Sequence, residues 1–258
     1  MKQIITKEEI EILTGAVKHL GQGRNIFDLN LPKDLHELLV EQYGFYPRNV
    51  EIGFFKQLLI EQLNEIRPGY SQDEFSAPII DKVSQYFTKD EKFLKTPGYS
   101  FDKGLLFMGP VGTGKTLLAK GIAQTLDLFS TINRADIRLM KMYILSSYKM
   151  AEAFSKDGIE IMETGIKTKD GCIVNTFQFI NRICFFDDLG AEGISTHFGS
   201  QANVMAEIFI RRYDTQIKTF ASTNLDRKNL KSFYGDRVYS RMVEMMNFIV
   251  MEGNDRRQ

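Results

Sequence analysis

The stretch Gly109–Thr116 carries the clearest chemistry in the sequence, because it fits the pattern G-x-x-x-x-G-K-[ST] at every fixed position. In such a loop the backbone N–H groups turn inward around phosphate oxygens, Lys115 reaches the β- and γ-phosphates, and the Thr116 hydroxyl binds Mg²⁺. An apolar run at 104–108 precedes the loop and an amphipathic helical pattern at 117–126 follows it, which is the context that the motif needs. The stretch predicts a nucleoside triphosphate site formed by Gly109, Pro110, Gly112, Thr113, Gly114, Lys115, Thr116 and Leu117.

A second candidate constellation is the acid pair Asp187 and Asp188, which follows the apolar run 183–186. A buried strand that ends in an acid places that acid at the carboxyl edge of a parallel sheet, where ligands bind. Asp187 is therefore expected to hold Mg²⁺, directly or through water, and Asp188 to orient or deprotonate the attacking water. An acidic surface turn after a strand is the alternative.

The run 217–224 predicts another strand, which ends in Asn224. Between the phosphate loop and the acid strand, an Asn can position water against the γ-phosphate, although strands that end in Asn also occur simply as turns.

A third cluster lies at 234–242, where Arg237 and Arg241 stand four residues apart on one face of a short helix. Two arginines on one face can bind phosphate or the acidic groups of a neighbouring molecule. Arg256 and Arg257 follow near the end of the sequence, where a frayed basic tail is the simpler interpretation.

These side chains need a parallel sheet flanked by helices, and the periodicity of the chain supplies candidate elements. Helices are expected at 6–20, after Pro32, at 50–66, 79–94, 135–149 and 203–213; strands at 104–108, 129–133, 183–186 and 217–224; and a hairpin within 165–174. The segment 152–176 is polar and interrupted by glycines, which fits a solvated insertion or a contact to DNA or a partner.

The domain organisation follows from this pattern. Residues 1–70 are predicted to form a small helical module, 71–78 a linker, and 79–258 an α/β domain. Residues 1–75 contain 8 Lys and Arg against 12 Asp and Glu, so this part is acidic and the remainder is mildly basic. An acidic N-terminal part argues against a DNA-binding arm there and suits docking on a protein.

The composition indicates an ordinary globular protein, with 43% hydrophobic and 26% charged residues. Cys172 and Cys184 have no metal-type spacing and suggest a reducing compartment. The sequence shows neither a signal peptide pattern nor an apolar run of membrane-spanning length. A cytoplasmic protein without membrane contact is therefore the expectation.

Taken together, these motifs resemble the AAA+ ATPases of the DnaC and IstB type, which are helicase loaders and transposition helper proteins. The resemblance covers roughly residues 78–258 and includes the phosphate loop, Asp187–Glu192, Arg211–Tyr213, Ser222–Asn224 and Tyr234–Met242. It implies an AAA+ P-loop fold with a central parallel sheet flanked by helices, and no C-terminal helical lid.

The resemblance also implies a role for each candidate residue. Lys115 and Thr116 match Walker A, Asp187 and Asp188 match Walker B, and Asn224 matches the sensor 1 position. The second acid is Asp where the wider AAA+ class commonly has Glu, which leaves Glu192 as a further candidate assistant. The remaining assignments are the arginine finger at Arg241, with Arg237 as its alternative, and sensor 2 at Arg257 or Arg256.

The function implied by the resemblance is an ATP- and Mg²⁺-dependent helicase loader that assembles as a ring or spiral. It would grip a replicative hexameric helicase through residues 1–70 and contact single-stranded DNA, with Lys141, Lys149 and the segment 152–176 as candidate DNA contacts. Two alternatives remain: a transposition helper ATPase that acts on duplex DNA beside a transposase, and a nucleotide-binding scaffold without a catalytic role.

Overall fold

The computed structural model of the protein describes residues 51–132, 142–157, 166–167, 173–174, 183–193, 195–197, 200–214, 217–253 and 255. Within these ranges, no helix combines the length and the apolar character that crossing a membrane requires. The helices expected at 6–20 and after Pro32, and with them most of the predicted N-terminal module, lie outside the described residues.

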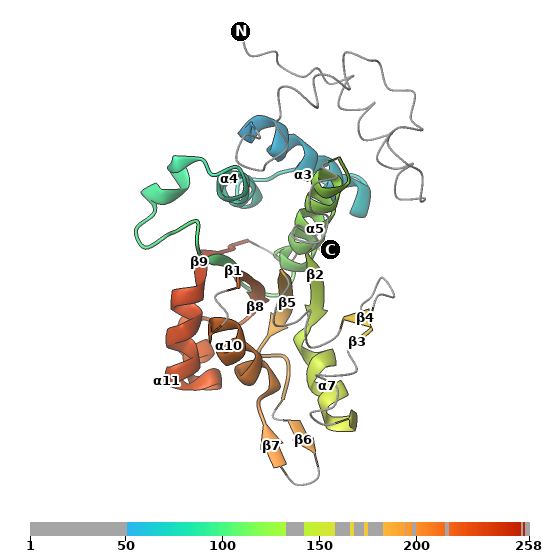
Figure 1. Ribbon diagram of the computed structural model, residues 1–258. Helices are drawn as coiled ribbons and strands as arrows, with labels where there is room; N and C mark the ends of the chain where they lie inside the picture. The colour runs from blue at the N-terminus through green and yellow to red at the C-terminus, as the bar shows by residue number, and fades with distance from the viewer. Residues whose placement is uncertain are drawn as a thin grey trace.

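A five-stranded parallel sheet forms the centre of the molecule, with the strand order β2-β5-β8-β1-β9 (Figure 1). Its strands are β1 (Gly104–Met108), β2 (Tyr143–Ser146), β5 (Cys184–Leu189), β8 (Thr219–Thr223) and β9 (Met246–Val250). Because β8 lies between β1 and β5, three adjacent strands bring the motifs to the same edge of the sheet: the phosphate loop follows β1, Asn224 follows β8, and the acid pair lies in the last half of β5.

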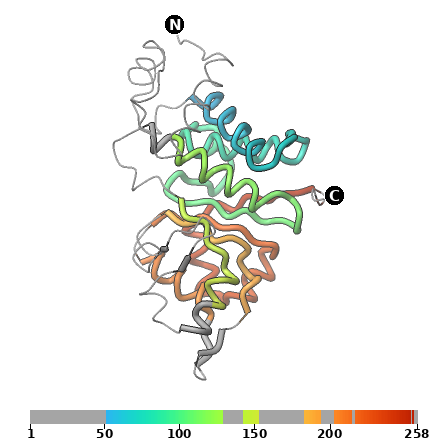
Figure 2. The backbone as a smooth tube through the Cα atoms, turned by 90° about the vertical axis from the view of Figure 1, so that its right-hand side faces the viewer, coloured from blue at the N-terminus to red at the C-terminus, as the bar shows by residue number. Residues whose placement is uncertain are grey.

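Helices cover both faces of this sheet, which explains why β1 is buried at every position. On one face lie α3 (Ile52–Ile66), α4 (Ser76–Phe87), the 3₁₀ helix η3 (Glu91–Lys95) and α5 (Lys115–Ile132). On the other lie α7 (Ser147–Asp157), α10 (Val204–Asp214) and α11 (Arg227–Met245). Figure 2 shows the same layers from the side. Successive β1 residues alternate between the two cores, with Leu105 in the first and Leu106 in the second.

The helix α3 packs directly on α5, so it belongs to the core of the α/β domain and not to a separate module. Leu59 and Leu63 of α3 are 0% and 1% exposed. A Cβ added at Gly121 of α5 would stand 2.7 Å from Cδ2 of Leu63, so the absence of a side chain there allows the close approach. The predicted boundary at residue 70 thus falls inside one continuous hydrophobic core, and α4 begins at Ser76, within the predicted linker.

Two sequence-based predictions for the segment after the phosphate-loop helix were wrong. Residues 129–132, expected to start a strand because of Phe, Thr and Ile, continue α5, since they follow an established helix with no intervening breaker. The second strand is Tyr143–Ser146, within the predicted helix 135–149, and its helix starts at Ser147. The predicted helix 79–94 is also divided, because Thr88 and Asp90 separate α4 from η3.

Other predicted elements are confirmed. The expected hairpin is present as β3 (Ile166–Lys167) paired antiparallel with β4 (Ile173–Val174). The sequence reasoning did not anticipate β9, although its residues Met-Asn-Phe-Ile-Val form an apolar run, nor the hairpin β6 (Ser195–His197) and β7 (Ser200–Ala202).

Candidate nucleotide-binding site

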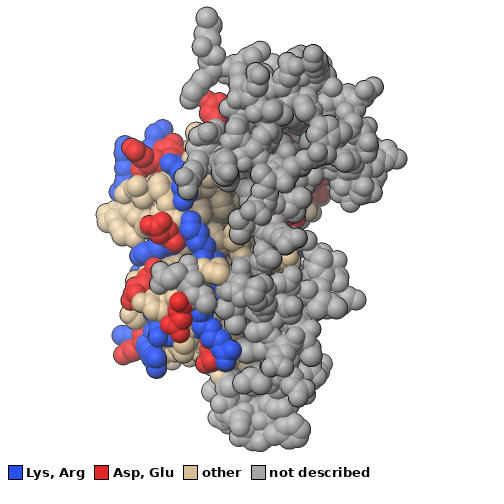
Figure 3. Space-filling model, in the orientation of Figure 1, with Lys and Arg blue, Asp and Glu red and all other residues tan. Residues whose placement is uncertain are grey.

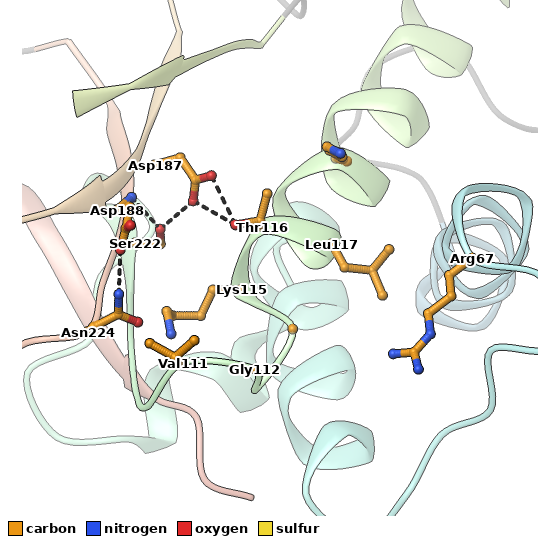
Figure 4. Close-up of a pocket in the computed structure, with 12 residues that line it drawn as sticks. Arg67, Val111, Gly112, Lys115, Thr116, Leu117, Asp187, Asp188, Ser222 and Asn224 are labelled. Atoms are coloured by element: carbon orange, nitrogen blue, oxygen red, sulfur yellow. Dashed lines mark hydrogen bonds between the residues drawn. The ribbon is translucent and has the colours of Figure 1, made fainter. Parts of the chain in front are cut away.

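A cleft of about 390 Å³ opens at the carboxyl ends of β1, β5 and β8 (Figure 4). This is the edge at which parallel α/β sheets bind ligands. The cleft brings together residues from three motifs that are far apart in sequence. It is lined by Arg67, Val111, Gly112, Gly114, Lys115, Thr116, Leu117, Lys120, Asp187, Asp188, Ser222 and Asn224.

The phosphate loop is held in shape by its own backbone. Gly112 and Gly114 have φ angles of 87° and 95°, which explains the need for glycine at both positions. The ammonium of Lys115 donates hydrogen bonds to the carbonyl oxygens of Gly109 and Pro110 at 2.6 and 2.7 Å, and its residue is only 7% exposed. The loop therefore keeps this charge beside the cleft, where phosphate oxygens would replace the carbonyl oxygens as acceptors.

Gly109, Pro110 and Thr113 do not line the cleft. Within the loop, the Thr113 hydroxyl donates to the Pro110 carbonyl at 2.9 Å.

Asp187 and Thr116 are in direct contact across the cleft. The Thr116 hydroxyl lies 3.1 and 2.9 Å from the two carboxylate oxygens of Asp187, and Ser222 Oγ donates to the same carboxylate at 2.6 Å. One hydroxyl and one carboxylate, completed by substrate phosphates and water, form the kind of ligand set that Mg²⁺ takes in nucleotide sites. The residues therefore fit the expected metal, with Thr116 and Asp187 as its protein ligands.

Asp188 adopts a left-handed backbone conformation with φ of 65°, which is uncommon outside glycine. The β5–β8 register shifts at this point, between Phe186 and Leu189. The Asp188 N–H donates to Ser222 Oγ at 2.9 Å, and its carbonyl accepts from Ser147 Oγ at 2.6 Å. Its side chain accepts a hydrogen bond from Asn224 Nδ2 (Figure 4). The turn thus presents the second carboxylate to the cleft and pairs it with the Asn.

A family model matches part of this α/β unit. Residues 105–225 match the model of the ATPase family associated with various cellular activities (AAA). This match covers just under half of the 258 residues, so it shows a similarity to that family. The matched range runs from β1 to just beyond β8, so it includes the phosphate loop, the acid pair and Asn224.

Individual relatives match parts of the chain. The ATP-dependent zinc metalloprotease FtsH of Chlorobium luteolum is 30% identical over 158 residues, which is 58% of this chain but 19% of that protein. The chain therefore matches about a fifth of this relative's length. FTSH 6 of Arabidopsis thaliana is 50% identical over 50 residues, 17% of this chain and 7% of that protein.

Among solved structures, the DnaC helicase loader superposes with a TM-score of 0.48 at 20% identity, over 72% of this chain and 96% of that one. AMPPCP-bound DnaA from Aquifex aeolicus superposes with a TM-score of 0.42 at 19% identity, over 73% of this chain and 50% of that one.

The two candidate arginines lie on α11, which follows the range matched by the family model, and they do not line the cleft. Arg237 is exposed. The Arg241 side chain is 17% exposed: its guanidinium carbon stands 4.9 Å from the centre of the Tyr213 ring, and Nη2 lies 3.9 Å from Asp214. Its Nη1 is buried and makes no hydrogen bond. The structure does not bring these residues to the phosphate loop of their own chain.

The sensor 2 candidates Arg256 and Arg257 lie outside the described residues. Asp255, just before them, packs against the phosphate loop, because a Cβ added at Gly112 would fall 2.1 Å from its Oδ1. The chain thus reaches the loop immediately before these arginines.

Four residues that line the cleft were not predicted as site residues from the sequence: Arg67, Val111, Lys120 and Ser222. Ser222 was noted only as part of a motif, although it joins Asp187 to Asp188. Arg67 and Lys120 have no motif of their own, and only the packing of α3 on α5 places Arg67 beside the loop.

Glu192, considered as a catalytic assistant, does not line the cleft and is only 1% exposed. Its carboxylate accepts hydrogen bonds from the Gly190 N–H at 2.8 Å and from the Tyr234 hydroxyl. It therefore ties the segment after the acid pair to α11, just before the helix kinks at Gly235. Burial raises the pKa of this carboxyl, although the hydrogen bonds from Tyr234, Ser147 and the backbone oppose the shift.

The raised pKa gives a prediction for stability against pH. The folded state binds the Glu192 proton more tightly than the unfolded state, whose carboxyl has a pKa near the usual 4.5. The contribution to stability is therefore fully present below that value and is lost as pH rises through the folded pKa. Glu192→Gln cannot titrate, so the free energy of unfolding of wild type minus that of the variant should fall as pH rises.

Urea unfolding of both proteins over a pH series measures this difference. Glu252→Gln, which removes an exposed carboxyl, is the control and should give a flat difference. A flat or rising difference for Glu192→Gln would contradict the assignment.

Proposed function

We propose that the protein is an ATP-dependent helicase loader whose subunits complete one another's nucleotide sites. The supporting observation is that the cleft assembles Lys115, Thr116, Asp187, Asp188 and Asn224, while Arg237 and Arg241 lie outside it. The motif resemblance to the DnaC and IstB group supplies the helicase-loading function, and its most specific elements, Asp-Asp-Leu-Gly and Gly-x-Arg-x-x-Ser-Arg, contain these same acids and arginines.

Within one subunit, the roles follow from the side-chain chemistry. Lys115 and the loop N–H groups bind the β- and γ-phosphates, as the backbone of a glycine-rich loop does at a helix N-terminus. Mg²⁺, held by Thr116 and Asp187, would neutralise charge on the phosphates. Asp188 accepts a proton from the attacking water, and Asn224, which donates to Asp188, fixes the direction of that carboxylate.

Between subunits, the arginines of α11 supply positive charge to the γ-phosphate held by a neighbour. Charge of this kind, supplied in trans, stabilises the transition state of phosphoryl transfer. Arg237 is exposed and can reach outward directly. Arg241 is held by Tyr213 and Asp214, so it reaches a neighbour only if those contacts are exchanged. The hydrogen bond from Tyr234 to Glu192 connects the segment after the acid pair to this helix.

Contact with single-stranded DNA is part of the proposal, and the first residues of α7 offer a surface for it. Tyr148 is 57% exposed and Lys149 beside it is also exposed. An aromatic ring with a neighbouring cation suits stacking of bases and attraction of the phosphate backbone. The described part of the face in Figure 3 mixes Lys and Arg with Asp and Glu, so no single-sign patch there marks a duplex-binding surface. Lys141 and most of the segment 152–176 lie outside the described residues.

A mixing experiment tests the division of the site between subunits. Asp188→Asn and Arg241→Ala should each bind ATP but hydrolyse it at least about 100-fold more slowly, because a proton acceptor or a charge is lost. When the two variants are mixed equally, an interface that pairs the intact acid of one with the intact arginine of the other is restored.

Random assembly should then give about a quarter of the wild-type rate. The same experiment with Arg237→Ala decides between the two arginines. If neither mixture recovers activity above its components, the site is not shared between subunits.

Affinity purification in ATP and Mg²⁺ tests the function itself. Wild type should retain a hexameric helicase, and Lys115→Ala should retain much less, because nucleotide binding controls the assembly. Recovery of a transposase would favour the transposition helper instead. A helicase retained equally by both proteins, with or without ATP, would favour a nucleotide-binding scaffold and contradict the proposal.

A further inference from the structure

Arg67 lines the cleft and directly follows α3, and the packing of that helix fixes where Arg67 stands. Leu59 and Leu63 of α3 pack at Gly121 of α5, and α5 begins at Lys115 of the phosphate loop. The same helix thus carries the phosphate-binding lysine at its start and the support for α3 two turns later. Arg67 is consequently held at a set position relative to the loop.

The backbone around Arg67 is fixed by local hydrogen bonds. Its N–H donates to the Leu63 carbonyl at 2.9 Å, and its carbonyl accepts from the Tyr70 N–H at 3.0 Å. The Gly69 N–H donates to Asn64 Oδ1 at 3.0 Å. These bonds close the end of α3 in a turn, so the side chain starts from an ordered backbone even though the residue is exposed.

The cleft has two chemically different ends. Asp187, Asp188 and Asn224 lie at one end, and Arg67 lies at the other with Leu117 between them (Figure 4). A nucleoside triphosphate is an elongated molecule. If its γ-phosphate lies beside the acids and Asn224, its nucleoside extends toward Arg67. At that end, Leu117 offers apolar surface against which a flat base can lie, and a planar guanidinium can stack on the face of such a ring (Figure 4).

From this geometry we propose that Arg67 binds the nucleoside portion of the nucleotide, at the end of the cleft away from the γ-phosphate. The proposal rests on the nucleotide site described above, but it does not depend on the helicase or on assembly. The end of α3 is then part of the nucleotide site. Nucleotide binding would in this way involve the helix that follows residues 1–50.

Binding measurements with three ligands separate a nucleoside contact from a phosphate contact. Arg67→Ala should weaken ATP and ADP by the same factor, about tenfold, because both carry the nucleoside. Inorganic tripolyphosphate has no nucleoside, so its affinity should stay at the wild-type value. Arg67→Lys keeps the charge but loses the planar group, and should resemble Arg67→Ala more than wild type.

Lys231→Ala is the control, since Lys231 is exposed, pairs with Asp236 and does not line the cleft. Unchanged ATP affinity in Arg67→Ala, or an equal loss for tripolyphosphate, would overturn the proposal. Lys115→Ala should weaken all three ligands; if it weakens none, the nucleotide site itself is wrong, which distinguishes that failure from a failure of the Arg67 contact alone.

Discussion

The hydrogen bonds of the Asp187 carboxylate are the interaction on which the site depends. Asp187 is 7% exposed, and it accepts from Thr116 at the start of α5 and from Ser222 on β8. Thr116 belongs to the phosphate-loop motif, which precedes Asp187 in the sequence, and Ser222 belongs to the Ser222–Asn224 motif, which follows it. A buried carboxylate requires such partners, because an unpaired charge in the interior is strongly destabilising. The bonds therefore stabilise the acid and hold three elements in one arrangement.

The sheet order makes this arrangement possible. With β8 between β1 and β5, Ser222 and Asn224 stand next to both the phosphate loop and the acid strand. Ser222 accepts from the Asp188 N–H while it donates to Asp187, so one hydroxyl supports both acids. Asn224 then restrains the second carboxylate. The left-handed Asp188 backbone is retained because these neighbours, together with Ser147, hold the turn.

The sequence predicted the parts of the site that depend on local pattern. The phosphate loop and the acid pair each follow an apolar run that is typical of a buried parallel strand, and Asn224 ends a further predicted strand, so their shared edge could be inferred. The extent of α5 could not be inferred in this way. Phe129 and Thr131 favour a strand locally, and they are helical only because they continue a long helix. Arg67 was missed for a different reason, since its place depends on the packing of α3 at Gly121.

Arg237 and Arg241 show a second limit. Their spacing on one helix face was readable, but their different environments were not, because the contact of Arg241 with Tyr213 joins α11 to α10. Local pattern therefore defines what each motif can do, while packing between helices defines which side chain is available to do it.

The most direct measurement of the central claim is the effect of Mg²⁺ on ATP affinity in wild type, Asp187→Asn and Thr116→Ser. If Thr116 and Asp187 are the two protein ligands of the metal, Mg²⁺ should strengthen ATP binding in wild type and in Thr116→Ser, which keeps the hydroxyl. In Asp187→Asn the enhancement should largely disappear while ATP binding without Mg²⁺ remains. An Asp187→Asn protein whose ATP affinity rises with Mg²⁺ as much as that of wild type would contradict the account.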